Sequence, residues 1–113
     1  MLAALFGAIQ GFDTNLRGFG AAANNVANLN TDGYRAQRYD PGTDSFEPRH
    51  ESSLGESGNP GADASDVELA EEFVDLMRYE LGVRANLQVI RVSDRLSGEL
   101  LDLMDIDREA ETR

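Results

Sequence analysis

Residues 21–35, AAANNVANLNTDGYR, contain the point at which a long apolar-periodic run ends and a polar segment begins. Four asparagines crowd this stretch, and their side chains compete with the helical backbone for hydrogen bonds. We therefore expect a helix to end near Asn28 and a turn to follow, with Gly33 free to adopt a positive φ angle. The predicted turn residues are Asn24, Asn25, Asn28, Gly33 and Tyr34.

The N-terminal run carries apolar residues at alternating spacings of three and four, the heptad pattern of a helix that packs along its length against another helix. Charge before residue 31 is limited to Asp13 and Arg17, so we expect more than one neighbour to cover this helix. Its glycines cost about 1 kcal/mol each relative to alanine, so the helix needs a packing partner. The stripe consists of Leu2, Leu5, Ile9, Phe12, Leu16, Phe19, Ala23 and Val26.

A second helix is predicted to begin at Ser65, because residues 65–68 match a capping box with Ser65 at the N-cap and Glu68 three positions later. It is predicted to run to about Met104 and to carry apolar stripes of its own. Both helices are expected to use these stripes in assembly. The interface residues predicted on the second helix are Leu69, Phe73, Leu76, Leu87, Ile90, Leu96, Leu100 and Leu103.

The middle of the chain has the composition of a linker, with all three prolines and few large hydrophobic residues. At most a short hairpin is expected near residues 34–39, and His50 is interpreted as a solvated residue. The fold class predicted is all-α, with two long terminal helices packed as an antiparallel coiled coil and joined by a flexible Gly/Pro/acid-rich linker. The predicted segments are the N-terminal helix and turn (1–35), the linker (36–64), the C-terminal helix (65–104) and a disordered acidic tail (105–113).

Composition excludes several classes of function. A chain of 113 residues has room for one small domain. The net charge of −11 argues against binding to nucleic acid or to an anionic membrane surface, since both need basic patches. There is no cysteine for a disulfide or a thiolate site. Residues 1–12 lack a basic n-region and are interrupted by Gly and Gln, so they read as neither a cleaved signal peptide nor a membrane span.

The sequence offers no catalytic constellation. Residues 18–23 formally match G-x-G-x-x-A, but no strand precedes them and Phe19 belongs to the apolar stripe. The acids at 102, 105 and 107 lack the loop, glycine and terminal glutamate of a calcium site. Without a nucleophile–base pair or a set of metal ligands, we predict no enzyme activity, no cofactor and no metal.

The turn resembles the N-terminal signature of the bacterial flagellar axial proteins, which form the rod and the hook. That signature reads as a small residue, Asn-Asn, an aliphatic residue, Ala-Asn, and then Gly-aromatic-basic; residues 23–28 and 33–35 fill these positions. Asp32 stands where many members carry proline. Residues 65–77 and 85–90, followed by Asp94 and a Leu-rich end, resemble the C-terminal signature of the family.

The resemblance implies a structural subunit of the flagellar basal-body rod, because the insert between the two signatures is shorter than in hook subunits. Such subunits leave the cytosol through the flagellar type III export apparatus without a cleaved signal peptide. They then assemble through their terminal helices into a periplasmic helical tube with themselves and other rod or hook subunits. The periodicity by itself also fits a soluble helical-hairpin adaptor or export chaperone that binds a partner helix.

Overall fold

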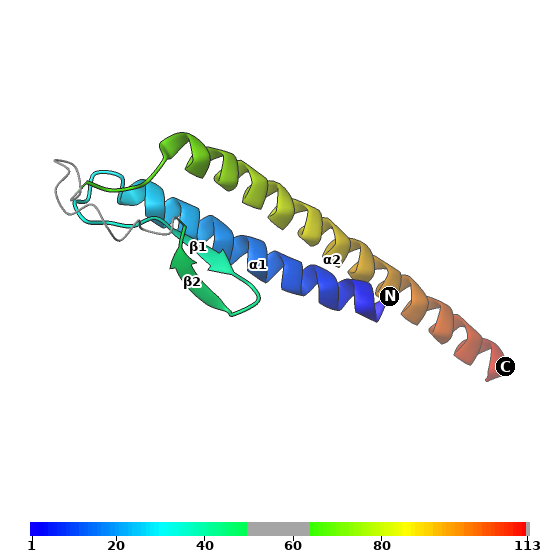
Figure 1. The fold of residues 1–113 in the computed structure, drawn as a ribbon. Helices are drawn as coiled ribbons and strands as arrows, with labels where there is room; N and C mark the ends of the chain where they lie inside the picture. The colour runs from blue at the N-terminus through cyan, green and yellow to red at the C-terminus, as the bar shows by residue number, and fades with distance from the viewer. Residues whose placement is uncertain (50–63, 113) are drawn as a thin grey trace.

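The computed structural model describes residues 1–49 and 64–112 and contains two long helices with a small sheet between them in the chain. Helices α1 and α2 lie side by side with opposite chain directions, and strand β1 of the small sheet lies against α1 (Figure 1). The molecule is extended, measuring 86 × 23 × 15 Å. The mostly helical class is therefore confirmed. The elements are α1 (Leu2–Ala27), β1 (Gln37–Asp40), β2 (Ser45–Pro48) and α2 (Leu69–Glu111).

Helix α1 ends where the sequence predicts. Its last residue is Ala27, and the backbone N–H of Asn28 donates to the last turn. The turn closes through backbone hydrogen bonds from Thr31 to Asn28 (3.0 Å) and from Tyr34 to Thr31 (3.1 Å). Gly33 has a φ angle of +74°, so the predicted need for a residue without Cβ is confirmed at this position.

Helix α2 begins later than predicted, at Leu69, and Glu68 is its N-cap. The prediction of a capping box that starts at Ser65 is therefore wrong. The reason lies in Asp66, whose carboxylate accepts a hydrogen bond of 2.5 Å from the backbone N–H of Ala36. Because residues 64–67 run beside the chain that leaves the turn, they are not helical and do not form the first turn of α2.

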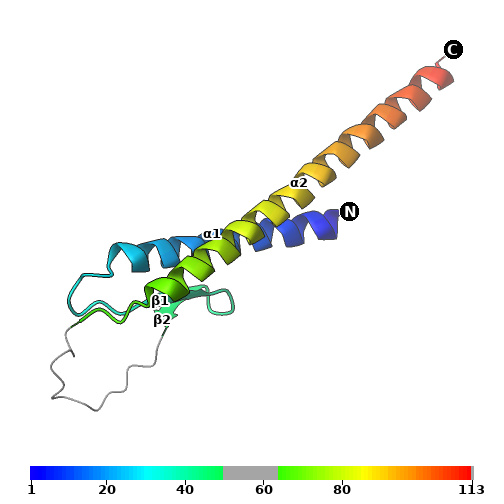
Figure 2. The same cartoon turned by 90° about the horizontal axis from the view of Figure 1, so that it is seen from above.

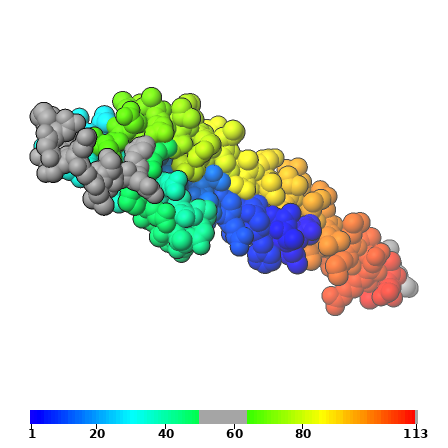
Figure 3. Space-filling view, in the orientation of Figure 1, coloured from blue at the N-terminus to red at the C-terminus, as the bar shows by residue number. Residues whose placement is uncertain are grey.

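Helix α2 also ends later than predicted, at Glu111 rather than near Met104. The prediction of a disordered tail is corrected over residues 105–111, which are rich in helix-forming Glu, Arg and Ala. The hydroxyl of Thr112 closes the end by donating to backbone carbonyl oxygens of the last turn. As a result α2 projects well beyond the N-terminal end of α1 (Figure 3).

The predicted linker contains an ordered hairpin, longer than the short one expected near residues 34–39. Strands β1 and β2 pair antiparallel, with Tyr39 opposite Phe46 and their ring centroids 5.5 Å apart. The hairpin is fastened to α1 by Arg17, which pairs with Asp44 at 3.0 Å and lies over the Tyr39 ring. Residues 50–63 of the predicted linker, including His50, lie outside the described residues.

Small and polar residues lie along the contact between the two helices. Gly18, for example, lies so close to the Tyr79 ring that an added Cβ would be 2.3 Å from it. As residue numbers rise along α1 they fall by the same amount along α2, and this fixes the antiparallel register. The facing pairs are Gly11 with Asn86, Asn15 with Gly82, Gly18 with Tyr79 and Asn25 with Glu72.

Two asparagines in this contact are arranged reciprocally. Asn15 packs over Gly82 of α2, and Asn86 packs over Gly11 of α1. Each asparagine also donates its side-chain N–H to the carbonyl oxygen four residues earlier in its own helix, at 2.6 Å and 2.9 Å. The helices can therefore approach closely without leaving these amide N–H groups unpaired, and Figure 2 shows that they cross at an angle.

The prediction that the helices pack on each other through their apolar stripes is wrong. The stripe expected on α1 lies one residue further along the chain than the contact at Gly11, Asn15 and Gly18, and one residue turns a helix by about 100°. The apolar core of the described residues is correspondingly small, since it contains no large side chain. Its members are Ala8, Ala21, Ala22, Ala36 and Val67.

Candidate functional site

Most of the large apolar side chains of both helices lie on the surface of the molecule. Leu16, at the centre of α1, is 50% exposed, and Phe73 near the start of α2 is 51% exposed. Of the predicted interface residues, those exposed are Leu2, Ile9, Leu16, Phe19, Leu69, Phe73, Leu96, Leu100 and Leu103. Those partly buried are Leu5, Phe12, Val26, Leu76, Leu87 and Ile90.

Further exposed apolar residues lie outside the predicted set. Each is at least 59% exposed: Phe6, Val74, Met77, Leu81, Leu101, Met104 and Ile106. A single heptad stripe cannot identify them, because they occupy other faces of the helices. Monomeric proteins rarely leave large contiguous apolar patches in water, since burying such surface gains about 25 cal/mol per Å². The outer faces of α1 and α2 are therefore candidate assembly surfaces.

A buried polar cluster joins α1, the turn, the hairpin and α2, and its centre is Asn25. The Asn25 side chain is fully buried. Its amide nitrogen donates to the carbonyl oxygen of Gln37 (2.8 Å) and to Oε1 of Glu72 (3.0 Å). Its amide oxygen accepts hydrogen bonds from the Gln37 backbone N–H and the Tyr34 hydroxyl, both at 2.9 Å. One side chain thereby fixes the positions of three other segments.

Arg49 supplies the positive charge of this cluster, immediately after β2. Its guanidinium donates to Oε1 of Glu72 at 2.9 Å and to the carboxylate of Asp75, and it lies 3.4 Å from Glu71. Burial alone would lower the pKa of Arg49, but the hydrogen bond and charge of Asp75 and the charges of Glu72 and Glu71 outweigh it and raise the pKa. Arg49 therefore remains charged and ties the hairpin to α2. We call Asn25, Tyr34, Arg49, Glu72 and Asp75 the polar junction.

Sequence reasoning missed Arg49, Glu72 and Asp75. A signal was present in the acids at 72 and 75, which lie three residues apart and so share one face of α2. Their partner could not be found from sequence, because Arg49 lies in a segment whose composition predicted a linker.

The predicted turn residues have different positions. Asn25 is buried, Asn24 is exposed at the surface, and Asn28 is partly buried. The Asn24 amide donates to the Tyr34 hydroxyl at 3.2 Å. Burial raises the pKa of the Tyr34 phenol; the Asn24 hydrogen bond opposes this shift. Gly33 is exposed and acts only through its backbone conformation.

The polar junction is suited to holding segments together. Oε1 of Glu72 accepts from both Asn25 and Arg49, while its Oε2 has no hydrogen-bond partner in the described structure. No group of His, Asp or Glu within residues 1–49 and 64–112 is arranged to hold a metal ion. Over the same ranges, neither helix combines the length and apolarity that crossing a bilayer requires.

No protein-family model matches the chain, and no curated protein matches it either.

Proposed function

We propose that this chain is a structural subunit of the bacterial flagellar basal-body rod. In this proposal its N- and C-terminal helices assemble into a helical tube with copies of itself and of other rod or hook subunits. The observation that carries the proposal is the inversion of the usual distribution of side chains: four alanines and a valine form the buried apolar core, while most of the large apolar side chains of the helices are exposed. The two stretches that resemble axial-protein signatures supply the identity of the assembly.

The inner contact would hold the two helices at a fixed register, so that their outer faces form one surface. We infer that α1 and α2 form an antiparallel coiled coil with a small and polar seam. The alternating spacing of Gly11, Asn15, Gly18 and Asn25 supports this geometry. A polar residue in such a seam specifies register at some cost in stability. Burial between subunits would then supply most of the stabilisation.

The polar junction would set the direction in which the hairpin leaves the helical pair. The Asn25 side chain hydrogen-bonds both the backbone N–H and the carbonyl oxygen of Gln37, at the start of the hairpin. Arg49 joins the other end of the hairpin to α2 through its ion pair with Glu72. The hairpin is thus placed along one side of α1, which leaves the remaining apolar faces of both helices open to neighbours. This is the arrangement that a subunit with several helical contacts needs.

Export and location follow from the same proposal. The chain would travel through the flagellar type III export apparatus without a cleaved signal peptide and would end in the periplasmic rod. Its partners would be proteins, with no nucleic acid and no insertion into the membrane.

Self-association tests the proposal. On concentration, sedimentation velocity should show assemblies far larger than a small oligomer. Leu16→Asp should abolish them while leaving the helical content unchanged, because Leu16 is half exposed in the single chain. Gln10→Asp, at an exposed polar position of the same helix, is the matched control and should assemble normally.

A chain that stops at a defined small oligomer at every concentration would contradict the proposal. That result would favour the soluble helical adaptor, which binds one partner helix and does not polymerise.

A further inference from the structure

The part of α2 beyond α1 continues the pattern of the helix contact but faces no other described segment of the chain (Figure 1). Positions Val89, Ser93 and Leu96 follow the spacing of the inner contact and lie beside the first turn of α1. The same spacing continues to Leu100 and Leu103, which are 51% and 61% exposed. The segment after Leu96 is 15 residues long up to the end of α2 and extends for about 22 Å.

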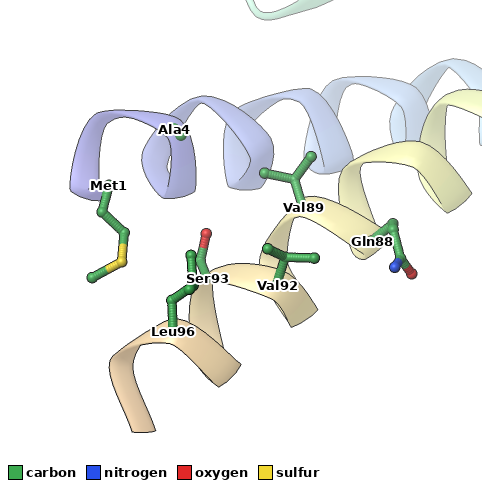
Figure 4. Close-up of a pocket in the computed structure, with 7 residues that line it drawn as sticks. All are labelled: Met1, Ala4, Gln88, Val89, Val92, Ser93 and Leu96. Carbon is green, nitrogen blue, oxygen red and sulfur yellow. The ribbon is translucent and has the colours of Figure 1, made fainter. Parts of the chain in front are cut away.

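An open apolar groove of about 480 Å³ lies where this projecting segment begins. Met1 and Ala4 of α1 form one side, and Val89, Val92 and Leu96 of α2 form the other (Figure 4). The groove therefore continues directly into the exposed leucines of the projecting segment. Together they form one apolar surface, which is long enough for a helix to lie along it.

The charges along this part of α2 are unevenly distributed. Residues 88–98 carry two arginines, Arg91 and Arg95, and one acid, whereas residues 99–111 carry six acids and one arginine. Two such segments placed parallel would bring acids against acids. Placed antiparallel, the acidic end of each would lie beside the arginines of the other.

We propose that the groove and the projecting segment form a self-complementary surface that binds a second copy of this chain. The C-terminal end of α2 of each copy lies antiparallel in the groove of the other, with the two-fold axis near Leu100. In that register Leu96 packs against Met104 of the second copy, and Arg95 lies opposite Asp105. Because each copy supplies both a groove and its occupant, the contact closes as a dimer.

This dimer does not depend on the proposed rod function. It uses the C-terminal part of α2, whereas the test of polymer formation uses Leu16 on α1. Within a rod pathway, the dimer would be the state of the free subunit and would cover the leucines of α2 before incorporation.

Disulfide trapping tests the register. The chain has no cysteine, so Leu100→Cys introduces a single thiol at the predicted axis. Under mild oxidation we expect it to form a disulfide-linked dimer in high yield at micromolar concentration. Leu81→Cys, also exposed on α2 but outside the groove, is the matched control and should form at least tenfold less. Equal yields from the two variants would overturn the proposal.

Exchanging the charges of opposed residues provides a second test, which needs no introduced cysteine. Replacing Arg91 and Arg95 with Glu should weaken dimerisation at least tenfold by light scattering, and adding Asp105→Arg and Glu109→Arg should restore it. A monomer of 12.3 kDa at all concentrations would overturn the antiparallel contact. A dimer whose dissociation constant does not change with these charge exchanges would overturn it as well. Loss of polymers in Leu16→Asp with the dimer retained would leave this inference intact.

Discussion

Gly18 and Gly20 provide a matched pair for testing the inner contact between the helices. Both lie in α1 two residues apart, but they face different surroundings. A Cβ added at Gly18 would lie 2.3 Å from Cε1 and 2.5 Å from Cζ of Tyr79, whereas a Cβ at Gly20 would meet nothing within 4 Å. The Tyr79 ring would have to leave its position, or the helices would have to separate, to accommodate Gly18→Ala.

The expected size of the effect follows from two opposing terms. Replacing glycine with alanine inside a helix gains about 1 kcal/mol in either variant. At Gly18 overpacking adds a cost of roughly 1–3 kcal/mol. Gly20→Ala should therefore stabilise the chain by about 1 kcal/mol. The free energy of unfolding of Gly18→Ala should be lower than that of Gly20→Ala by roughly 1–3 kcal/mol. The gain in helix propensity is the same in both variants, so it does not contribute to this difference.

Urea unfolding followed by far-UV circular dichroism measures this difference, with both variants at the same protein concentration. Helix α2 offers an independent repeat, because a Cβ at Gly82 would lie 2.3 Å from Asn15 while Gly98 has open space. Equal stabilisation by Gly18→Ala and Gly20→Ala would refute the reasoning, since it would mean that α2 does not pack against Gly18.

Three further predictions concern the polar junction. Asn25→Ala should lower the free energy of unfolding by about 2–4 kcal/mol, because buried donors and acceptors lose their partner, while the surface variant Asn24→Ala should change it by less than about 0.5 kcal/mol; urea unfolding of both tests this. Arg49→Met should cost about 3–5 kcal/mol in the same assay, because it leaves the buried Glu72 carboxylate without its cation. Finally, because the pKa of Tyr34 is raised in the folded state, the free energy of unfolding should fall as the pH rises above the ordinary value of 10.0, and thermal unfolding of Tyr34→Phe should show a smaller decline over that range.

The sequence predicts the end of α1 well because local chemistry decides it. Asparagines that compete with the helical backbone and a glycine with positive φ act within a few residues, so Asn28 and Gly33 could be placed from sequence. The start of α2 could not be predicted in this way, because the Asp66 carboxylate accepts a hydrogen bond from the backbone N–H of Ala36, which lies 30 residues away in the chain. Local propensity contains no information about such a contact.

The helix contact shows a second limit. The side of α1 that faces α2 was predicted wrongly, because apolar stripes are normally taken to face the partner within the same chain. Here Gly11, Asn15 and Gly18 face α2, while Leu16 faces outward. A sequence alone does not say which of two stripes on a helix faces the partner helix within the chain. The polar junction was missed for the same reason, since Arg49 meets Glu72 only after the chain has folded.

Localisation of the protein in purified flagellar basal bodies tests the central claim most directly. An epitope tag placed after residue 112, beyond the end of α2, can be detected by immunogold electron microscopy. The proposed function predicts label along the rod, and its loss in Leu16→Asp but not in Gln10→Asp. Basal bodies that carry no label in cells that contain the tagged protein would contradict the assignment of this chain to the rod.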